Sequence, residues 1–166
     1  MNFKELWEKI NIKRLLKYVL YMFLGLVTQN MLFTQLRIFG VCPMVLPAMA
    51  VAVGMFEGAS WGAIFSLVMG IFADMAYIEN TIMFTLLFPA LAFASGFISQ
   101  FFINRRFFAF MGAAFLALLI TGVVQMMKTL AMDGWAWSMI PTVLMQTAWS
   151  LPPAVLAYFP PAKWIE

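Results

Sequence analysis

Three side chains that could take part in chemistry lie inside otherwise apolar stretches: the carboxyl of Asp74, the amide of Gln125 and the amine of Lys128. Gln125 and Lys128 are three residues apart, so a helix would place them on one face. A charged group in an apolar segment is a candidate functional site, because it is unfavourable there without a partner. The sequence therefore predicts an ion pair between Asp74 and Lys128, direct or through Gln125. The alternative is that each charge reaches the polar surface separately.

The composition argues against most catalytic arrangements. The 166 residues include no His and a single Cys, Cys42. The chain therefore lacks the ligands of an ordinary zinc site, the imidazole of a Ser-His or Cys-His nucleophile, and the second thiol of an internal disulfide. We expect a protein that is not an enzyme and that holds neither a metal nor a cofactor.

The overall composition is that of a membrane protein. Apolar residues make up 64% of the chain, charged residues make up 10%, and the mean hydropathy is +0.93. These values lie far outside the range of soluble domains. Six apolar runs are each near the roughly 20 residues that cross a bilayer, and the breaks between them are short enough to require antiparallel hairpins. We predict an all-α, polytopic integral membrane protein, a single domain over 1–166 with six transmembrane helices in one compact bundle. The spans are expected at about 15–36, 38–56, 59–78, 81–103, 107–131 and 136–160.

Prolines complicate two of these spans. Pro43 and Pro47 fall in the second apolar run, so this segment could be broken or re-entrant, which leaves five spans as the alternative to six. In the last run, the Pro-Pro pair at 152–153 predicts a bend or interruption, and the pair at 160–161 predicts the end of the helix.

Basic residues are unevenly divided between the two sides of the predicted bundle. With six spans and a cytoplasmic amino terminus, eight of the ten Lys and Arg residues lie on the cytoplasmic side, and only Arg37 and Lys128 lie on the other. This asymmetry predicts that both termini are cytoplasmic.

The first residues have the pattern of a surface helix. Apolar side chains recur at helical spacing within 1–14, which predicts an amphipathic segment on the membrane surface. Trp7, Lys13 and Arg14 are expected to anchor it there. The alternative is a solvated basic tail that only sets the orientation of the chain.

Small residues recur every four positions ahead of Asp74: Gly58, Gly62, Ser66 and Gly70. Residues four apart share a helix face, and a face without large side chains lets a second backbone approach closely. At 3.6 residues per turn this face drifts through roughly 160° by Asp74. We therefore expect it to cross its partner obliquely or to change partner along its length.

Two amides, Gln29 and Asn30, fall in the outer third of the first span. Amides at this depth usually form hydrogen bonds with neighbouring helices. Alternatively, they line a polar cluster at the outer end of the bundle, where Asp74 and Lys128 fall at nearly the same depth. The predicted intramembrane polar cluster is Asp74, Lys128, Gln125, Gln29 and Asn30.

Several of these features together resemble one family. The basic amino-terminal segment, the amide-rich end of the first span, the G-x-x-P turn at 40–43 and the G-x-x-x-D motif at 70–74 resemble MreD, the rod shape-determining membrane protein of bacteria. The resemblance covers about residues 15–131, and its most specific part is GASWGAIFSLVMGIFAD. Two positions depart from the family pattern. Met44 follows the turn proline where a polar residue is common, and Ser66 stands where another glycine is expected.

The resemblance implies a non-enzymatic scaffold of the cell-wall elongation machinery (the elongasome) in the bacterial cytoplasmic (inner) membrane. Such a protein maintains cell shape during peptidoglycan synthesis through helix–helix contacts with partner membrane proteins. The implied partners are an MreC-like single-span protein, RodA with its penicillin-binding transpeptidase, the MreB filament and membrane lipids, with no nucleic acid.

The resemblance also implies a fold similar to the substrate-binding S components of energy-coupling-factor transporters. The alternative function is therefore capture of a small solute by the predicted polar cluster. Two features argue against it. The first span contains no alanine, whereas S components typically dock through an Ala-x-x-x-Ala face on that helix. A metal-type solute would require His or several acidic residues near the outer surface, and His is absent.

Overall fold

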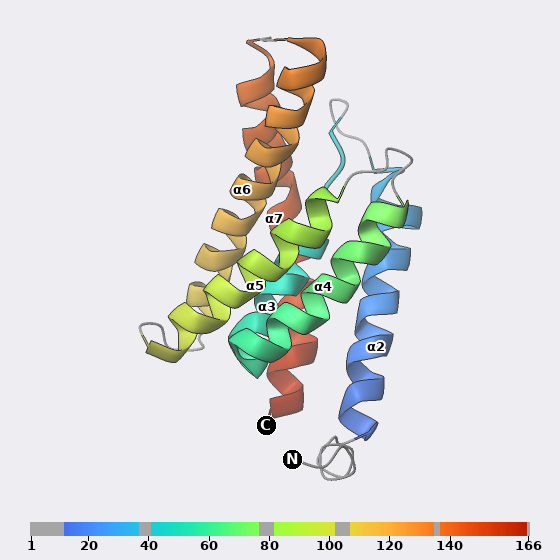
Figure 1. Ribbon diagram of the computed structural model, residues 1–166, viewed down its shortest axis with the longest axis vertical. Coiled ribbons are helices and arrows are strands. Elements are labelled where there is room, and N and C mark those ends of the chain that lie inside the picture. Colours follow the sequence, from blue (N-terminus) through green and yellow to red (C-terminus); the bar gives the residue numbers. More distant parts are fainter. Residues whose placement is uncertain (1–11, 37–40, 77–81, 102–106, 135–136, 166) are drawn as a thin grey trace.

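The computed structural model describes residues 12–36, 41–76, 82–101, 107–134 and 137–165 (Figure 1). About 90% of the described residues are helical, which confirms the predicted all-α class. The elements in chain order are α2 (Ile12–Val27), the π-helix η1 (Thr28–Phe33), α3 (Leu46–Glu57), α4 (Ala59–Ala76), α5 (Met83–Phe101), α6 (Phe107–Asp133) and α7 (Met139–Ile165).

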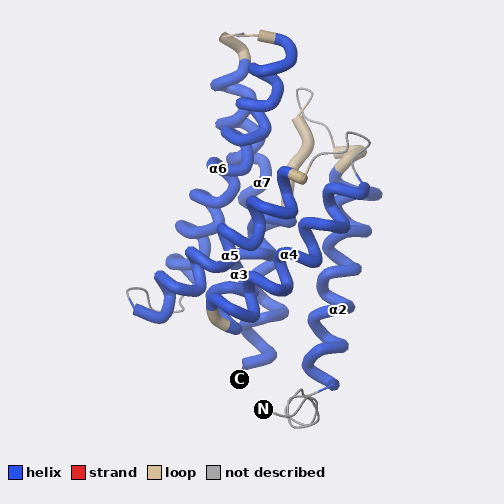
Figure 2. The backbone as a smooth tube through the Cα atoms, viewed as in Figure 1, coloured by secondary structure: helices blue, strands red, loops and turns tan. Residues whose placement is uncertain are grey.

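The helices run up and down between two ends of the molecule, so that α2 begins and α7 ends at the same lower end (Figure 1). Figure 2 shows that the described non-helical segments lie near these ends and before α3. Within the described residues, four helical segments are long and apolar enough to cross a membrane: Leu15–Phe33, Ala59–Ala76, Met83–Gln100 and Phe107–Ala131. The helices are therefore compatible with a membrane location. Six crossings and the orientation of the termini stay predictions.

The second predicted span is a short helix at the centre of the molecule. α3 has 12 residues, of which all but Glu57 are buried. At 1.5 Å per residue it is about 18 Å long, less than the roughly 30 Å of a hydrocarbon core. Its alanines, such as Ala48, Ala50 and Ala52, let α4, α5, α6 and α7 pack closely around it. The segment 41–45 that precedes α3 is not helical, so the broken-segment alternative describes this part of the chain.

Glycines bring α3, α4 and α5 into backbone contact. A Cβ atom on Gly62 would lie 2.4 Å from the Cα of Gly54 in α3, and one on Gly54 would lie 2.2 Å from the carbonyl oxygen of Ala92 in α5. One turn before Asp74, a Cβ on Gly70 would lie 2.6 Å from the carbonyl oxygen of Phe84. The small-residue face of α4 thus changes partner from α3 to α5, which is one of the two outcomes expected from its drift.

Gly58 and Ser66, the other two members of this face, have different surroundings from Gly62 and Gly70, which touch the backbone of a neighbouring helix. Gly58 forms the turn between α3 and α4, where its φ of 95° favours glycine. Ser66 is fully buried, and its hydroxyl makes no hydrogen bond within the described part of the chain.

The proline pairs of the last helix neither interrupt nor end it. α7 continues through both pairs to Ile165, so the prediction that the pair at 160–161 terminates the helix is wrong. Pro161 cannot donate the backbone hydrogen bond that the carbonyl of Ala157, four residues earlier, would otherwise accept. The hydroxyl of Tyr21 in α2 donates to that carbonyl instead, at 2.7 Å. A side chain from another helix therefore replaces the missing bond.

The predicted surface segment falls mainly outside the described residues. Trp7 lies there, whereas Lys13 and Arg14 belong to the first turn of α2, with side chains outside the described part. The surface anchor at 1–14 therefore stays a prediction. The first described helix, α2, begins at Ile12, within the last three residues of that predicted segment. A hydrogen bond from the Tyr18 hydroxyl to Glu57 Oε1 joins α2 to the end of α3.

Candidate functional site

Asp74 caps the amino terminus of α5. Its Oδ1 accepts a hydrogen bond from the backbone N–H of Phe84 at 3.1 Å. Its Oδ2 accepts from the backbone N–H and the hydroxyl of Thr85, at 2.8 and 2.7 Å. The first N–H groups of a helix lack partners within the helix and carry partial positive charge. The buried carboxylate, 9% exposed, therefore supplies from α4 the cap that a residue just before α5 would ordinarily supply.

Within the described residues, the partner that Asp74 binds is the first turn of α5, whereas the partner predicted from the sequence is Lys128. Lys128 lies within α6, but its side chain is outside the described part, so the ion pair stays a prediction. The partner that sequence reasoning missed is the first turn of α5, with Thr85 as its side-chain donor. The sequence around α5 gave little indication of this cap, because Asp74 lies in the preceding helix, ten residues before Phe84 and eleven before Thr85.

Gln29 holds the non-helical segment that leads into α3. Its Nε2 donates to the carbonyl of Pro43 at 3.0 Å, and its Oε1 accepts from the backbone N–H of Val45 at 2.9 Å. A neighbouring strand would satisfy an extended segment with the same pair of bonds. Because Gln29 is only 4% exposed, its amide makes this irregular backbone tolerable in the protein interior.

A second group of polar side chains approaches the same segment from α6 and α7. Ser150 Oγ accepts from the backbone N–H of Met44 at 2.8 Å. Gln125 Nε2 lies 3.6 Å from the sulfur of Met44, and Gln125 Oε1 accepts from Gln146 Nε2 at 3.3 Å. Residues of η1, α6 and α7 therefore meet around the entrance to α3.

The structure brings together only part of the predicted polar cluster. Gln29 and Gln125 meet around residues 43–45, whereas Asp74 binds the first turn of α5 and Asn30 is exposed. Ser150 and Gln146 were missed as members. The signal that could have found them is their spacing of four, which places two polar side chains on one face of the last helix.

The Gln29 contacts carry a testable consequence. Gln29→Leu leaves the Pro43 carbonyl and the Val45 N–H buried without a partner, and we expect it to lower the free energy of unfolding by about 2–3 kcal/mol. The matched control is Asn30→Leu, one residue along the same helix and exposed, which should change it by less than about 0.5 kcal/mol. Thermal unfolding in detergent micelles measures both. Equal effects at the two positions would show that the amide does not hold this segment.

The fold and these contacts define a helical protein compatible with a membrane location, in which polar side chains bind the chain's own backbone. No protein-family model, no curated protein and no solved structure matches the chain.

Proposed function

We propose that this protein is a non-enzymatic scaffold of the bacterial cell-wall elongation machinery in the cytoplasmic membrane. Its proposed partners are an MreC-like single-span protein, RodA with its penicillin-binding transpeptidase, and the MreB filament. The resemblance of the motifs at 40–43 and 58–74 to the MreD pattern supports this assignment.

One structural observation favours a scaffold over a transporter component. The polar side chains that a solute-binding protein would turn toward its ligand are engaged by the chain's own backbone. Both oxygens of Asp74 accept bonds from α5, and both ends of the Gln29 amide bond to residues 43–45. These groups assemble the helices, and a solute could use them only by displacing those bonds.

The proposed topology has six crossings and two cytoplasmic ends. α2 with η1, α4, α5 and α6 supply four crossings. α3 with the segment 41–45 forms a broken fifth, and α7, with 27 residues or about 40 Å, is long enough for the sixth. The common lower end of α2 and α7 and the bias of basic residues toward that side support this arrangement.

The surfaces available to partners also follow from the packing. The small-residue face of α4 is buried against α3 and α5, so it is not free for another protein. Partner helices must therefore contact outward-facing side chains, such as Leu16, Leu20 and Phe23 on α2, which are more than half exposed.

Depletion of the protein in its native host tests this function. A scaffold of side-wall elongation is expected to give rounded cells when it is lost, and re-expression should restore rods. Cells that keep their shape but lose uptake of one vitamin would instead establish the transporter function.

A further inference from the structure

The proline pairs of α7 leave backbone carbonyls without their usual donors. Proline has no N–H, so the carbonyl four residues before it lacks its partner in the helix. The pairs at 152–153 and 160–161 act in this way on the carbonyls of four residues: Ala148, Trp149, Leu156 and Ala157. The Tyr21 hydroxyl donates to the Ala157 carbonyl at 2.7 Å. Within the described residues, no side-chain hydrogen bond reaches the other three carbonyls.

Two of these carbonyls belong to residues on the outward side of α7. The side that packs on α3 and α6 carries buried residues at helical spacing: Val143, Thr147, Ser150, Ala154, Ala157 and Pro161. Ala148 and Pro152 are exposed on the opposite side, and Leu156 is 68% exposed. A helical carbonyl points toward the residue four positions later, so the Ala148 carbonyl lies beside the ring of Pro152. The Leu156 carbonyl follows about 12 Å further along the helix.

The depth of these two carbonyls makes them unfavourable in lipid. They fall in the middle of a helix of 27 residues, which in the proposed topology is the centre of the membrane. No water is present there to satisfy a backbone carbonyl, and a neighbouring helix is a usual source of the replacement donor. Ala148 carries only a methyl group, so another helix can approach its backbone closely. The outward side of α7 therefore favours a helix with hydroxyl donors over a lipid chain.

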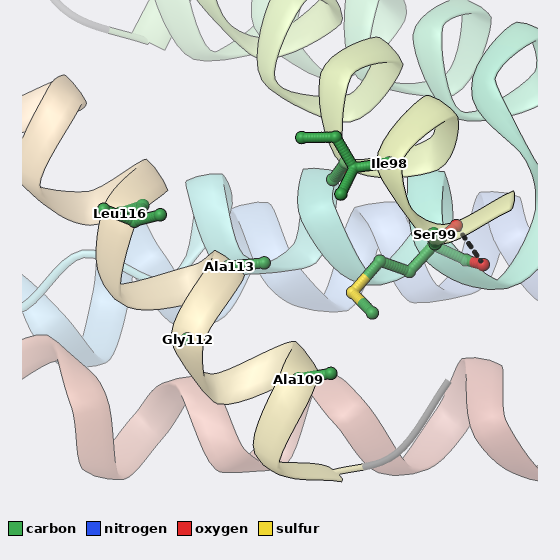
Figure 3. A pocket seen from close by; sticks show the side chains of 8 residues that line it. Ile98, Ser99, Ala109, Gly112, Ala113 and Leu116 are labelled. Atoms are coloured by element: carbon green, nitrogen blue, oxygen red, sulfur yellow. Dashed lines mark hydrogen bonds between the residues drawn. The ribbon is translucent and has the colours of Figure 1, made fainter. Parts of the chain in front are cut away.

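The cleft between α5 and α6 differs from this side of α7, because its hydroxyl groups already have acceptors (Figure 3). The Ser99 hydroxyl lies 2.9 Å from the carbonyl oxygen of Gly96 and 3.3 Å from that of Met55. The Ser95 hydroxyl lies 3.0 Å from the carbonyl oxygen of Ala92. The serines of the cleft therefore leave no unmet hydrogen bond that would select a partner, whereas the carbonyls of α7 select one with donors.

We propose that the outward side of α7 around Ala148 and Pro152 binds a transmembrane helix of a partner protein. Ser or Thr hydroxyls of that helix donate to the carbonyls of Ala148 and Leu156. Pairing of two α7 helices does not supply these donors, because Thr147 and Ser150 are buried on the other side. This surface deepens the scaffold function and rests on it, since the proposed topology places α7 across the membrane.

Binding of designed peptides to the full chain in nanodiscs tests this surface. The probe is a transmembrane peptide of leucine and alanine, about 24 residues long, with two serines spaced as Ala148 and Leu156 are. The comparison peptide has alanine in place of both serines. Energy transfer from the labelled peptide to a dye on Glu166→Cys, in a Cys42→Ser chain, measures the affinity. We expect the serine peptide to bind about fivefold more tightly.

Proline variants show whether the carbonyls are responsible. Pro152→Ala combined with Pro160→Ala returns an N–H donor to both carbonyls and should abolish the fivefold preference. Pro141→Ala is the matched control, because Pro141 is exposed in the first turn of α7, where an N–H has no acceptor in the helix. It should keep the preference, and thermal unfolding checks that each variant folds. Equal affinity for the two peptides, or a preference that survives in the double variant, would overturn the proposal.

Photocrosslinking in native membranes examines the natural partner, with a benzophenone side chain in place of Leu144. Capture of another membrane protein that Pro141→Ala keeps and the double proline variant loses supports the surface. Capture of a second copy, or capture unchanged in the double variant, would overturn it. The scaffold function can fail independently. Rounded depleted cells without the peptide preference reject this surface alone, whereas the peptide preference with normally shaped depleted cells rejects the scaffold function alone.

Discussion

Gly62→Ala is expected to lower the free energy of unfolding by about 3 kcal/mol, at the upper end of the usual cost of overpacking. The added Cβ would lie 2.4 Å from the Cα of Gly54 and 2.9 Å from its backbone nitrogen. Both are backbone atoms of a central helix, so neither can rotate away as the end of a flexible side chain can. The only relief is separation of α3 from α4, which would also disturb the contact of α3 with α5.

Gly112→Ala is the matched control, because it is the same substitution inside a helix, at an exposed position where the added Cβ meets nothing within 4 Å. It should raise the stability by up to about 1 kcal/mol, since alanine loses less backbone entropy than glycine in a helix. Denaturant titration of the purified protein in mixed micelles measures both changes. Similar effects at 62 and 112 would show that helix propensity, and not backbone contact, dominates at Gly62.

Asp74→Ala should cost about 3–4 kcal/mol, because it leaves the buried N–H of Phe84 and the part-buried N–H and hydroxyl of Thr85 without an acceptor. Asp74→Asn keeps one carbonyl acceptor and should cost less, about 2 kcal/mol. Thr85→Val removes the hydroxyl bond alone and should cost about 1 kcal/mol. Hydrogen exchange of the first turn of α5 is the accompanying measurement, and the N–H groups of Phe84 and Thr85 should lose protection in Asp74→Ala.

The order of these three variants distinguishes capping from ion pairing. If Asp74 acts mainly through Lys128, Asp74→Asn and Lys128→Met should be coupled in a double-mutant cycle, and Thr85→Val should be nearly silent. Capping predicts the opposite, with coupling between Asp74 and Thr85. A silent Asp74→Ala would contradict both interpretations.

The sequence predicted the helices best where hydrophobic length alone decides them. The third, fourth and fifth expected spans match α4, α5 and α6 to within two residues at each end. The bounds of the second span were predicted less well. Pro43 and Pro47 indicated a possible break, but α3 is apolar on every side and the run from 38 to 56 has no polar residue to show where the helix begins. The contacts that shorten this helix come from Gln29 and Ser150, which are distant in the chain.

The polar residues were identified more readily than their partners. Asp74 stands out in an apolar run, but a carboxylate can be satisfied by a cation or by a helix amino terminus, and its residue type does not distinguish these. The small-residue spacing likewise predicted a packing face that either crosses its partner obliquely or changes partner, and the structure shows the change of partner. The spacing could not predict that Gly62 packs against Gly54, which lies only four residues before the face begins. This contact depends on the sharp turn at Gly58, which folds α4 back onto α3.

The site of new wall synthesis tests the proposed scaffold function most directly. Cells depleted of the protein are pulsed with a fluorescent D-amino acid, and its incorporation along the side wall and at the septum is measured by microscopy. The proposed function predicts that side-wall incorporation is lost while septal incorporation continues. Unchanged side-wall incorporation in depleted cells would contradict it.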